Sequence, residues 1–137
     1  MDLDLKERLE RAIRADGRYP PEAYEFLYRG LEFASQRKYA LRPGKSRHVT
    51  GQELAEALRD LAVRQWGPLA REVLRRWSIH RTRDFGEMVY FLIEQEAMSR
   101  QESDDIADFD DVYDFREAFA EYHIALNGAR EDEDGEV

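Results

Sequence analysis

Apolar residues at the start of the chain recur at helical spacing. Leu5, Leu9, Ala12 and Ile13 fall on one face, and Asp16-Gly17 follows with a residue suited to a left-handed helix end. Pro20-Pro21 then begins a second helix, because a proline in the first turn gives up an amide hydrogen that has no partner there. Apolar positions of that helix repeat at intervals of three and four: Ala23, Phe26, Leu27, Gly30, Leu31 and Ala34. The pattern predicts two helices, with Tyr24 and Tyr28 on the outer face of the second.

The periodicity stops between residues 37 and 48. Pro43-Gly44 marks a turn there, and the stretch carries basic residues without an acidic one: Arg37, Lys38, Arg42, Lys45 and Arg47. We therefore predict a basic loop or hairpin.

Three further helices follow from the pattern. Thr50 and Glu53 have the spacing of a capping box, so a helix begins there and its apolar stripe runs to Trp66. Gly67-Pro68 ends that helix and starts a fourth, which reaches Trp77. A fifth runs from Thr82 to about residue 97 and is apolar on two faces, which predicts a central position. The core is predicted to contain Leu54, Leu58, Leu61, Trp66, Val73, Leu74, Phe85, Val89, Leu92 and Ile93.

The chain from residue 97 to 114 combines acidic and apolar residues. Apolar side chains such as Ile106, Phe109 and Val112 argue against disorder, so we expect two short strands or an ordered loop folded back on the helices. A last helix begins near Phe115 and ends at Asn127-Gly128. The sequence predicts a mainly α fold: one globular domain over residues 1–128 with five or six helices and at most a short β hairpin, and an acidic flexible tail over 129–137. Residues 50–115 could be winged-helix-like, although helical bundles also contain such corners.

Charge is unevenly distributed along this chain of 137 residues. The net charge of −9 divides into +3 for residues 1–100 and −12 for residues 101–137, so only the first part could face an anionic partner. The fifth helix and the predicted wing are mostly acidic, which makes nucleic acid an unlikely partner. The chain has no cysteine and no long apolar run, so we expect a cytoplasmic protein that does not cross a membrane.

Catalytic and metal-binding patterns are weak. The acidic run at 104–111 lacks the turn glycine and terminal glutamate of a calcium loop. His80 and Asp84 could form a hydrolytic dyad, but the sequence has no nucleophile elbow, phosphate loop or zinc-binding helix to accompany it. We therefore predict no catalytic residue, metal or cofactor, and the hydrolase hypothesis is the weakest of three.

Arginine and tyrosine are the residues that strengthen protein interfaces. The candidate interaction surface consists of Tyr24, Tyr28, Arg37, Lys38, Arg42, Lys45, Arg47, Arg71, Arg75 and Arg76. A solvated face with pairs between arginine and glutamate is the alternative interpretation of its charges. The predicted function is a non-enzymatic protein-binding or adaptor module with an unidentified protein partner, and a nucleic-acid-associated winged-helix regulator is the main alternative.

Several short strings together resemble a small family of uncharacterised bacterial proteins associated with planctomycetes and verrucomicrobia. They are Arg18-Tyr19-Pro20, Glu22-Ala23-Tyr24, His48-Val49, Gly51, Glu53-Leu54, Gly67-Pro68, Val73-Leu74, Trp77, Thr82, Asp84-Phe85-Gly86, Asp108-Phe109 and Tyr113-Asp114-Phe115. The resemblance covers residues 16 to 120. It implies no activity, cofactor or catalytic residue, because the family has none assigned.

Overall fold

A computed structural model describes residues 3–41 and 48–119. This part of the chain is mainly helical and contains no strand, which confirms the predicted fold class. The elements are α1 (Leu3–Asp16), α2 (Pro21–Leu41), α3 (Gly51–Trp66), the 3-10 helix η1 (Gly67–Leu69), α4 (Ala70–Arg76), α5 (Thr82–Glu94), the 3-10 helix η2 (Ile106–Phe109) and α6 (Phe115–Ala118). The predicted acidic tail and most of the predicted last helix lie outside the described residues.

The helix boundaries follow the local signals closely. Gly17 ends α1 with a φ of 77°, the left-handed conformation that glycine adopts freely. At the start of α3 the Thr50 hydroxyl accepts from the Glu53 amide, and the Glu53 carboxylate accepts from the Thr50 amide. Gly67-Pro68 forms the corner between α3 and α4 as predicted. Capping residues were therefore reliable guides to where the helices begin and end.

Two boundaries differ from the prediction. Residues 37–41, expected in a basic loop, are the last turn of α2, because Arg37 and Lys38 are held against α3. The Lys38 ammonium donates to the Glu53 carboxylate at 3.0 Å and to the His48 carbonyl at 2.6 Å. Helix α5 ends at Glu94, before residue 97, since Glu96 takes a left-handed φ of 61° that a helix cannot include.

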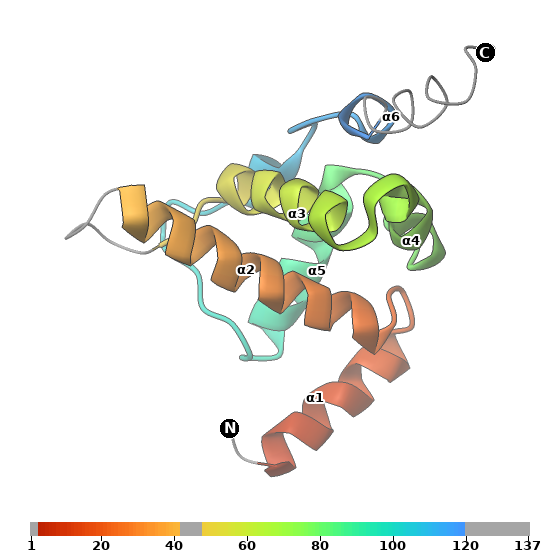
Figure 1. Cartoon of the computed structure of the whole chain (residues 1–137). Helices are drawn as coiled ribbons and strands as arrows, with labels where there is room; N and C mark the ends of the chain where they lie inside the picture. The colour runs from red at the N-terminus through yellow and green to blue at the C-terminus, as the bar shows by residue number, and fades with distance from the viewer. Residues whose placement is uncertain (1–2, 42–47, 120–137) are drawn as a thin grey trace, which may run out of the picture.

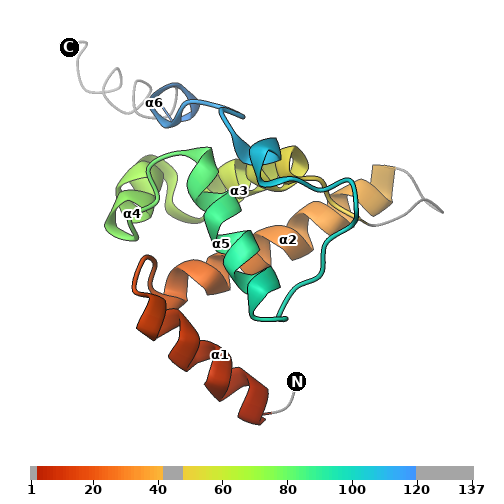
Figure 2. The ribbon, with the colours of Figure 1, turned by 180° about the vertical axis from the view of Figure 1, so that it is seen from behind.

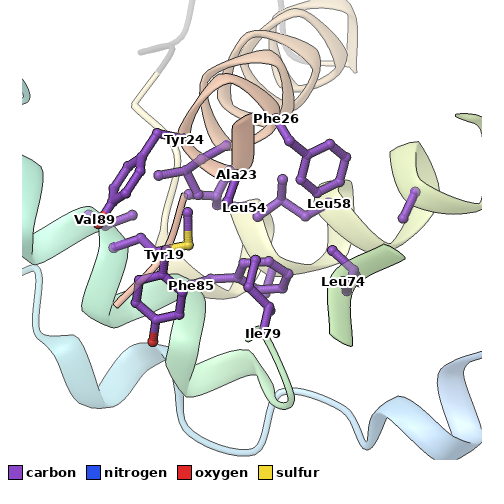
Figure 3. Packing of buried hydrophobic residues seen from close by; sticks show 14 of the residues in the cluster. Tyr19, Ala23, Tyr24, Phe26, Leu54, Leu58, Leu74, Ile79, Phe85 and Val89 are labelled. Atoms are coloured by element: carbon purple, nitrogen blue, oxygen red, sulfur yellow. The ribbon is translucent and has the colours of Figure 1, made fainter. Parts of the chain in front are cut away.

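Helix α5 occupies the centre of the described fold. Figures 1 and 2 show α2 crossing one side of it, with α3 alongside α2 and α1 projecting at one end of the molecule. Seven α5 residues are buried, among them Phe85, Met88 and Leu92. Gly30 permits α2 to approach α3 closely, because an added Cβ there would lie 2.1 Å from a Leu58 methyl carbon. Figure 3 shows the side chains that meet between these helices.

The predicted core is largely confirmed. Leu54, Leu58, Leu74, Phe85, Val89 and Leu92 are buried, while Leu61, Trp66 and Ile93 are partly buried and pack against them. Val73 is partly exposed instead, because the seven-residue α4 lies at the surface and buries only Ala70 and Leu74. Phe26 and Ile79 are fully buried residues that the predicted core left out.

The acidic segment between α5 and α6 folds back on the helices as an ordered loop. It forms η2 and turns rather than the hairpin that a winged helix would require. Its Phe109 ring is buried against two glycines: a Cβ added at Gly51 of α3 or at Gly86 of α5 would lie 2.9 Å from that ring. The two glycines thus create the slot that receives Phe109.

The Thr82 hydroxyl fastens the same segment. It donates to the Phe109 carbonyl at 2.6 Å and accepts from the Val112 amide at 3.2 Å. Thr82 is only 1% exposed, so its hydroxyl makes both bonds in a buried position. One buried side chain therefore provides a hydrogen-bond partner for two backbone groups, at Phe109 and Val112.

We predict that Thr82→Val lowers the free energy of unfolding by about 2–4 kcal/mol, because it leaves two backbone groups without a partner at nearly constant volume. Thr82→Ser keeps the hydroxyl and loses a methyl group, so its cost should be about 1 kcal/mol. Urea denaturation of both variants measures the difference. Equal losses for valine and serine would mean that the hydroxyl contributes packing alone.

Candidate functional site

The structure corrects the placement of Tyr24. The ring faces inward from α2 and is 2% exposed, so it cannot belong to a contact surface. It packs 5.9 Å from the ring of Phe91 on α5 and 6.4 Å from that of Tyr19. Figure 3 shows Tyr24 reaching from α2 towards α5. Because α5 lies across α2, the part of the predicted outer face around Tyr24 is covered.

The predicted residues near the end of α2 serve mainly to join α2 to its neighbours. Tyr28 is 36% exposed, and its hydroxyl donates to the Ala97 carbonyl. Arg37 donates to the Asp60 carboxylate of α3 at 2.7 Å and lies over the Phe33 ring. Arg42, Lys45 and Arg47 lie outside the described residues. Within the described ranges this part of the predicted surface is therefore already engaged.

The three predicted arginines of α4 divide into two kinds. Arg75 and Arg76 both donate to Glu72, which lies one turn earlier in the same helix. This is the solvated face with arginine–glutamate pairs that was the alternative interpretation. Arg71 has no ion pair with any residue in the described ranges. It is the member of this group that stays available.

Arg71 lines a cleft between α4, the start of α5 and the segment before α6, with a volume of about 530 Å³. Arg81 and Arg116 line the same cleft, and neither has an ion-pair partner within 3–41 or 48–119. We call this the arginine cleft; its lining is Arg71, His80, Arg81, Thr82, Arg83, Asp110, Asp111, Tyr113, Asp114, Phe115 and Arg116. Three exposed arginines, from α4, the start of α5 and α6, thus line one cleft.

Two of the three aspartates that line the cleft are already bonded to other groups. Asp110 accepts from Arg83 at 2.9 Å, and Asp114 accepts the backbone amides of Arg116 and Glu117 at the start of α6. These bonds satisfy carboxylates without using Arg71, Arg81 or Arg116. The arginine cleft therefore offers cationic donors that its own aspartates do not occupy.

The predicted pair of His80 and Asp84 forms no dyad. The Asp84 carboxylate accepts from the backbone amides of His80 and Arg81, at 2.8 and 3.2 Å, and from the Tyr19 hydroxyl at 2.7 Å. It caps α5 and ties Tyr19 to it, and its partner at residue 80 is the backbone instead of the imidazole. This arrangement gives the histidine ring no carboxylate to orient it for general-base catalysis.

Metal ligation and membrane insertion are two further possibilities for residues 3–41 and 48–119. These residues include no cluster of three or more histidine, cysteine, aspartate or glutamate side chains placed to hold a metal ion. None of their helices has the length and apolarity needed to cross a bilayer.

Comparisons with known proteins add no relative. The chain matches no protein-family model, and neither the curated proteins nor the solved structures include a significant match to it. Its resemblance to the bacterial family named above therefore stays a prediction, and the cleft has to be interpreted from its own geometry.

Arg116 was missed as a site residue because it belongs to the acidic part of the sequence. Counting charges by segment assigned residues 101–137 to the repelling half, yet the chain folds back and brings this side chain beside Arg71 and Arg81. The predicted return of the acidic segment was the available signal. That prediction placed the aspartates against the helices. Extended to residue 116, it would also have placed Arg116 there.

The Arg37–Asp60 contact predicts a dependence of stability on pH. Burial alone would raise the pKa of Asp60, but hydrogen bonds from Arg37 and Arg59 outweigh it and lower that pKa below its usual value. A carboxylate whose pKa is lower in the folded state stabilises the fold above its unfolded pKa, and this contribution is lost as the pH falls through the folded pKa.

We therefore expect Asp60→Asn to reduce stability at neutral pH and to make the acid limb of the stability curve shallower. Thermal unfolding of both proteins between pH 7 and about pH 3 measures this, since the usual aspartate pKa is about 3.9. If the stability curves of the two proteins stay parallel down to about pH 3, the Arg37–Asp60 pair makes no pH-dependent contribution to stability.

Proposed function

We propose that the protein is a non-enzymatic protein-binding module that receives an acidic segment of a partner protein in the arginine cleft. The observation that carries this proposal is the convergence of Arg71, Arg81 and Arg116 on one hollow without ion-pair partners among the described residues. Guanidinium groups bind carboxylates through two parallel hydrogen bonds, and arginine is enriched at protein interfaces.

An exposed apolar residue supports the same surface. Leu69, two residues before Arg71, is 62% exposed at the corner that leads into α4. Single exposed leucines are common on protein surfaces, but one this near the arginine cleft offers a partner segment an apolar contact. A partner segment with both aspartate or glutamate and an apolar residue would match this corner better than a purely charged polymer.

The winged-helix hypothesis has less support. In that fold the third helix of the motif presents its outer face to the major groove. Here α5 is largely buried, its Arg83 is paired with Glu87 and Asp110, and η2 packs against it where a wing would extend outward. Phosphate would meet the carboxylates of residues 104–111 on approach, which disfavours binding.

A labelled peptide that contains a run of glutamates and one leucine tests the proposal. We predict that Arg81→Gln and Arg116→Gln each weaken its binding about fivefold or more, as loss of a charge-assisted hydrogen bond does. Arg29→Gln is the matched control, because Arg29 is exposed on α2 and outside the cleft. Fluorescence anisotropy measures all three, and equal effects would indicate only a loss of overall charge.

The nucleic-acid alternative has its own test. We expect random duplex DNA to show no measurable affinity for the full chain at low salt, so that no salt dependence can be recorded. Tight binding that weakens steeply as salt rises, and that Arg81→Gln reduces, would favour the regulator over the binding module.

A further inference from the structure

A second cavity lies on another side of η2, and the proposed function does not use it. It has a volume of about 280 Å³, near the lower end of the range for small-molecule sites. Its walls come from α2, the start of α3, α5 and the chain between residues 98 and 109. The apolar part of the lining is Leu31, Val49, Leu54, Val89, Ile93, Met98 and Phe109. Such a lining can hold the apolar part of a ligand.

Tyr90 is the unusual polar residue of this cavity. Its hydroxyl is buried and has no hydrogen-bond partner in the described part of the chain, although the residue lines the hollow. A buried hydroxyl without a partner costs free energy, whereas phenylalanine in its place would not incur that cost. A ligand in the cavity that bonds to this hydroxyl would remove that cost.

Carboxylates surround the polar edge of the cavity. Asp104 pairs with His48 at 3.1 Å, but Asp105 and Asp108 bond only to backbone amides of their own turn. Arg100 lies 5.8 Å from the centre of the Tyr90 ring, and its bonds go to backbone carbonyls instead of to these aspartates. Two carboxylates at this edge thus lack a cationic side chain among the described residues.

We propose that this cavity binds a small organic ammonium ion with an apolar body. The apolar part occupies the wall formed by Leu54, Val89 and Phe109. The ammonium group lies at the edge, where Asp105 and Asp108 supply negative charge and the Tyr90 oxygen accepts a hydrogen bond. The lining has three aspartates against one arginine, Arg100, so a carboxylate ligand of the same size would bind more weakly than an ammonium ion.

The Tyr90 hydroxyl provides the sharpest test, because the chain contains a matched control. Tyr24 also has a buried hydroxyl without a partner, but it does not line this cavity. Replacing either tyrosine with phenylalanine should leave the unfolding temperature unchanged or raise it. If the inference holds, only Tyr90→Phe should impair ligand binding.

The probes are benzylamine, benzyl alcohol and benzoate, which share one ring and differ in charge. Amide chemical shifts of the full chain, followed by NMR during titration, should show benzylamine binding at the cavity, benzyl alcohol more weakly and benzoate most weakly. We expect Tyr90→Phe and Asp108→Asn each to weaken benzylamine binding about tenfold. Asparagine at 108 retains an oxygen for the Asp105 amide, so the turn is preserved.

Glu25→Gln, on an exposed part of α2 outside the cavity, controls for the change in net charge. Tyr24→Phe and Glu25→Gln should bind benzylamine as the unmodified chain does. The inference is overturned if benzylamine perturbs no cavity amide, if benzoate or benzyl alcohol binds as tightly, or if the control variants weaken binding as much as Tyr90→Phe and Asp108→Asn.

Discussion

The placement of Phe109 between two glycines is the constraint on which the described fold depends. Gly51 and Gly86 leave room for the ring on α3 and α5, and no residue with a Cβ fits at either position without displacing it. The Thr82 hydroxyl then donates to the Phe109 carbonyl and accepts from the Val112 amide. An acidic segment that would otherwise favour solvent is thereby fixed against the most buried helix, because apolar burial and satisfied backbone groups outweigh its cost in entropy.

Both candidate sites follow from that fixation. Residues 104–109 form one edge of the cavity for which an ammonium ligand is proposed, and residues 110–116 form one edge of the arginine cleft. Among the described residues, the same segment therefore supplies carboxylates without a cationic partner on one side and an arginine without an acidic partner on the other. If both proposals hold, consecutive residues of one segment serve two surfaces with opposite electrostatic preferences.

Local signals predicted the helices well because caps and turns depend on neighbouring residues, as Thr50, Gly17 and Gly67 illustrate. The site was harder, because availability depends on partners distant in sequence. Arg37 pairs with Asp60, and Tyr24 is covered by α5, so neither contributes to the predicted surface. Periodicity identifies which face of a helix is apolar. A helix that is covered on two sides, as α2 is, also buries side chains such as Tyr24 that lie off that face. Arg116 lines the cleft because the chain folds back after α5. A charge count by sequence segment does not take such a return into account.

The slot for Phe109 also bears on synthesis at the ribosome. Helices α1 to α5 can form as they emerge, since their caps are local, but Gly86 and Thr82 face an open groove until residues 109–112 leave the exit tunnel. A nascent chain that has emerged only to residue 100 would leave uncovered the face of α5 that carries Gly86 and Thr82, and incompletely covered apolar surface leads partly folded chains to aggregate. Completion of the core therefore waits until the acidic segment has emerged and its Phe109 ring can fill the slot.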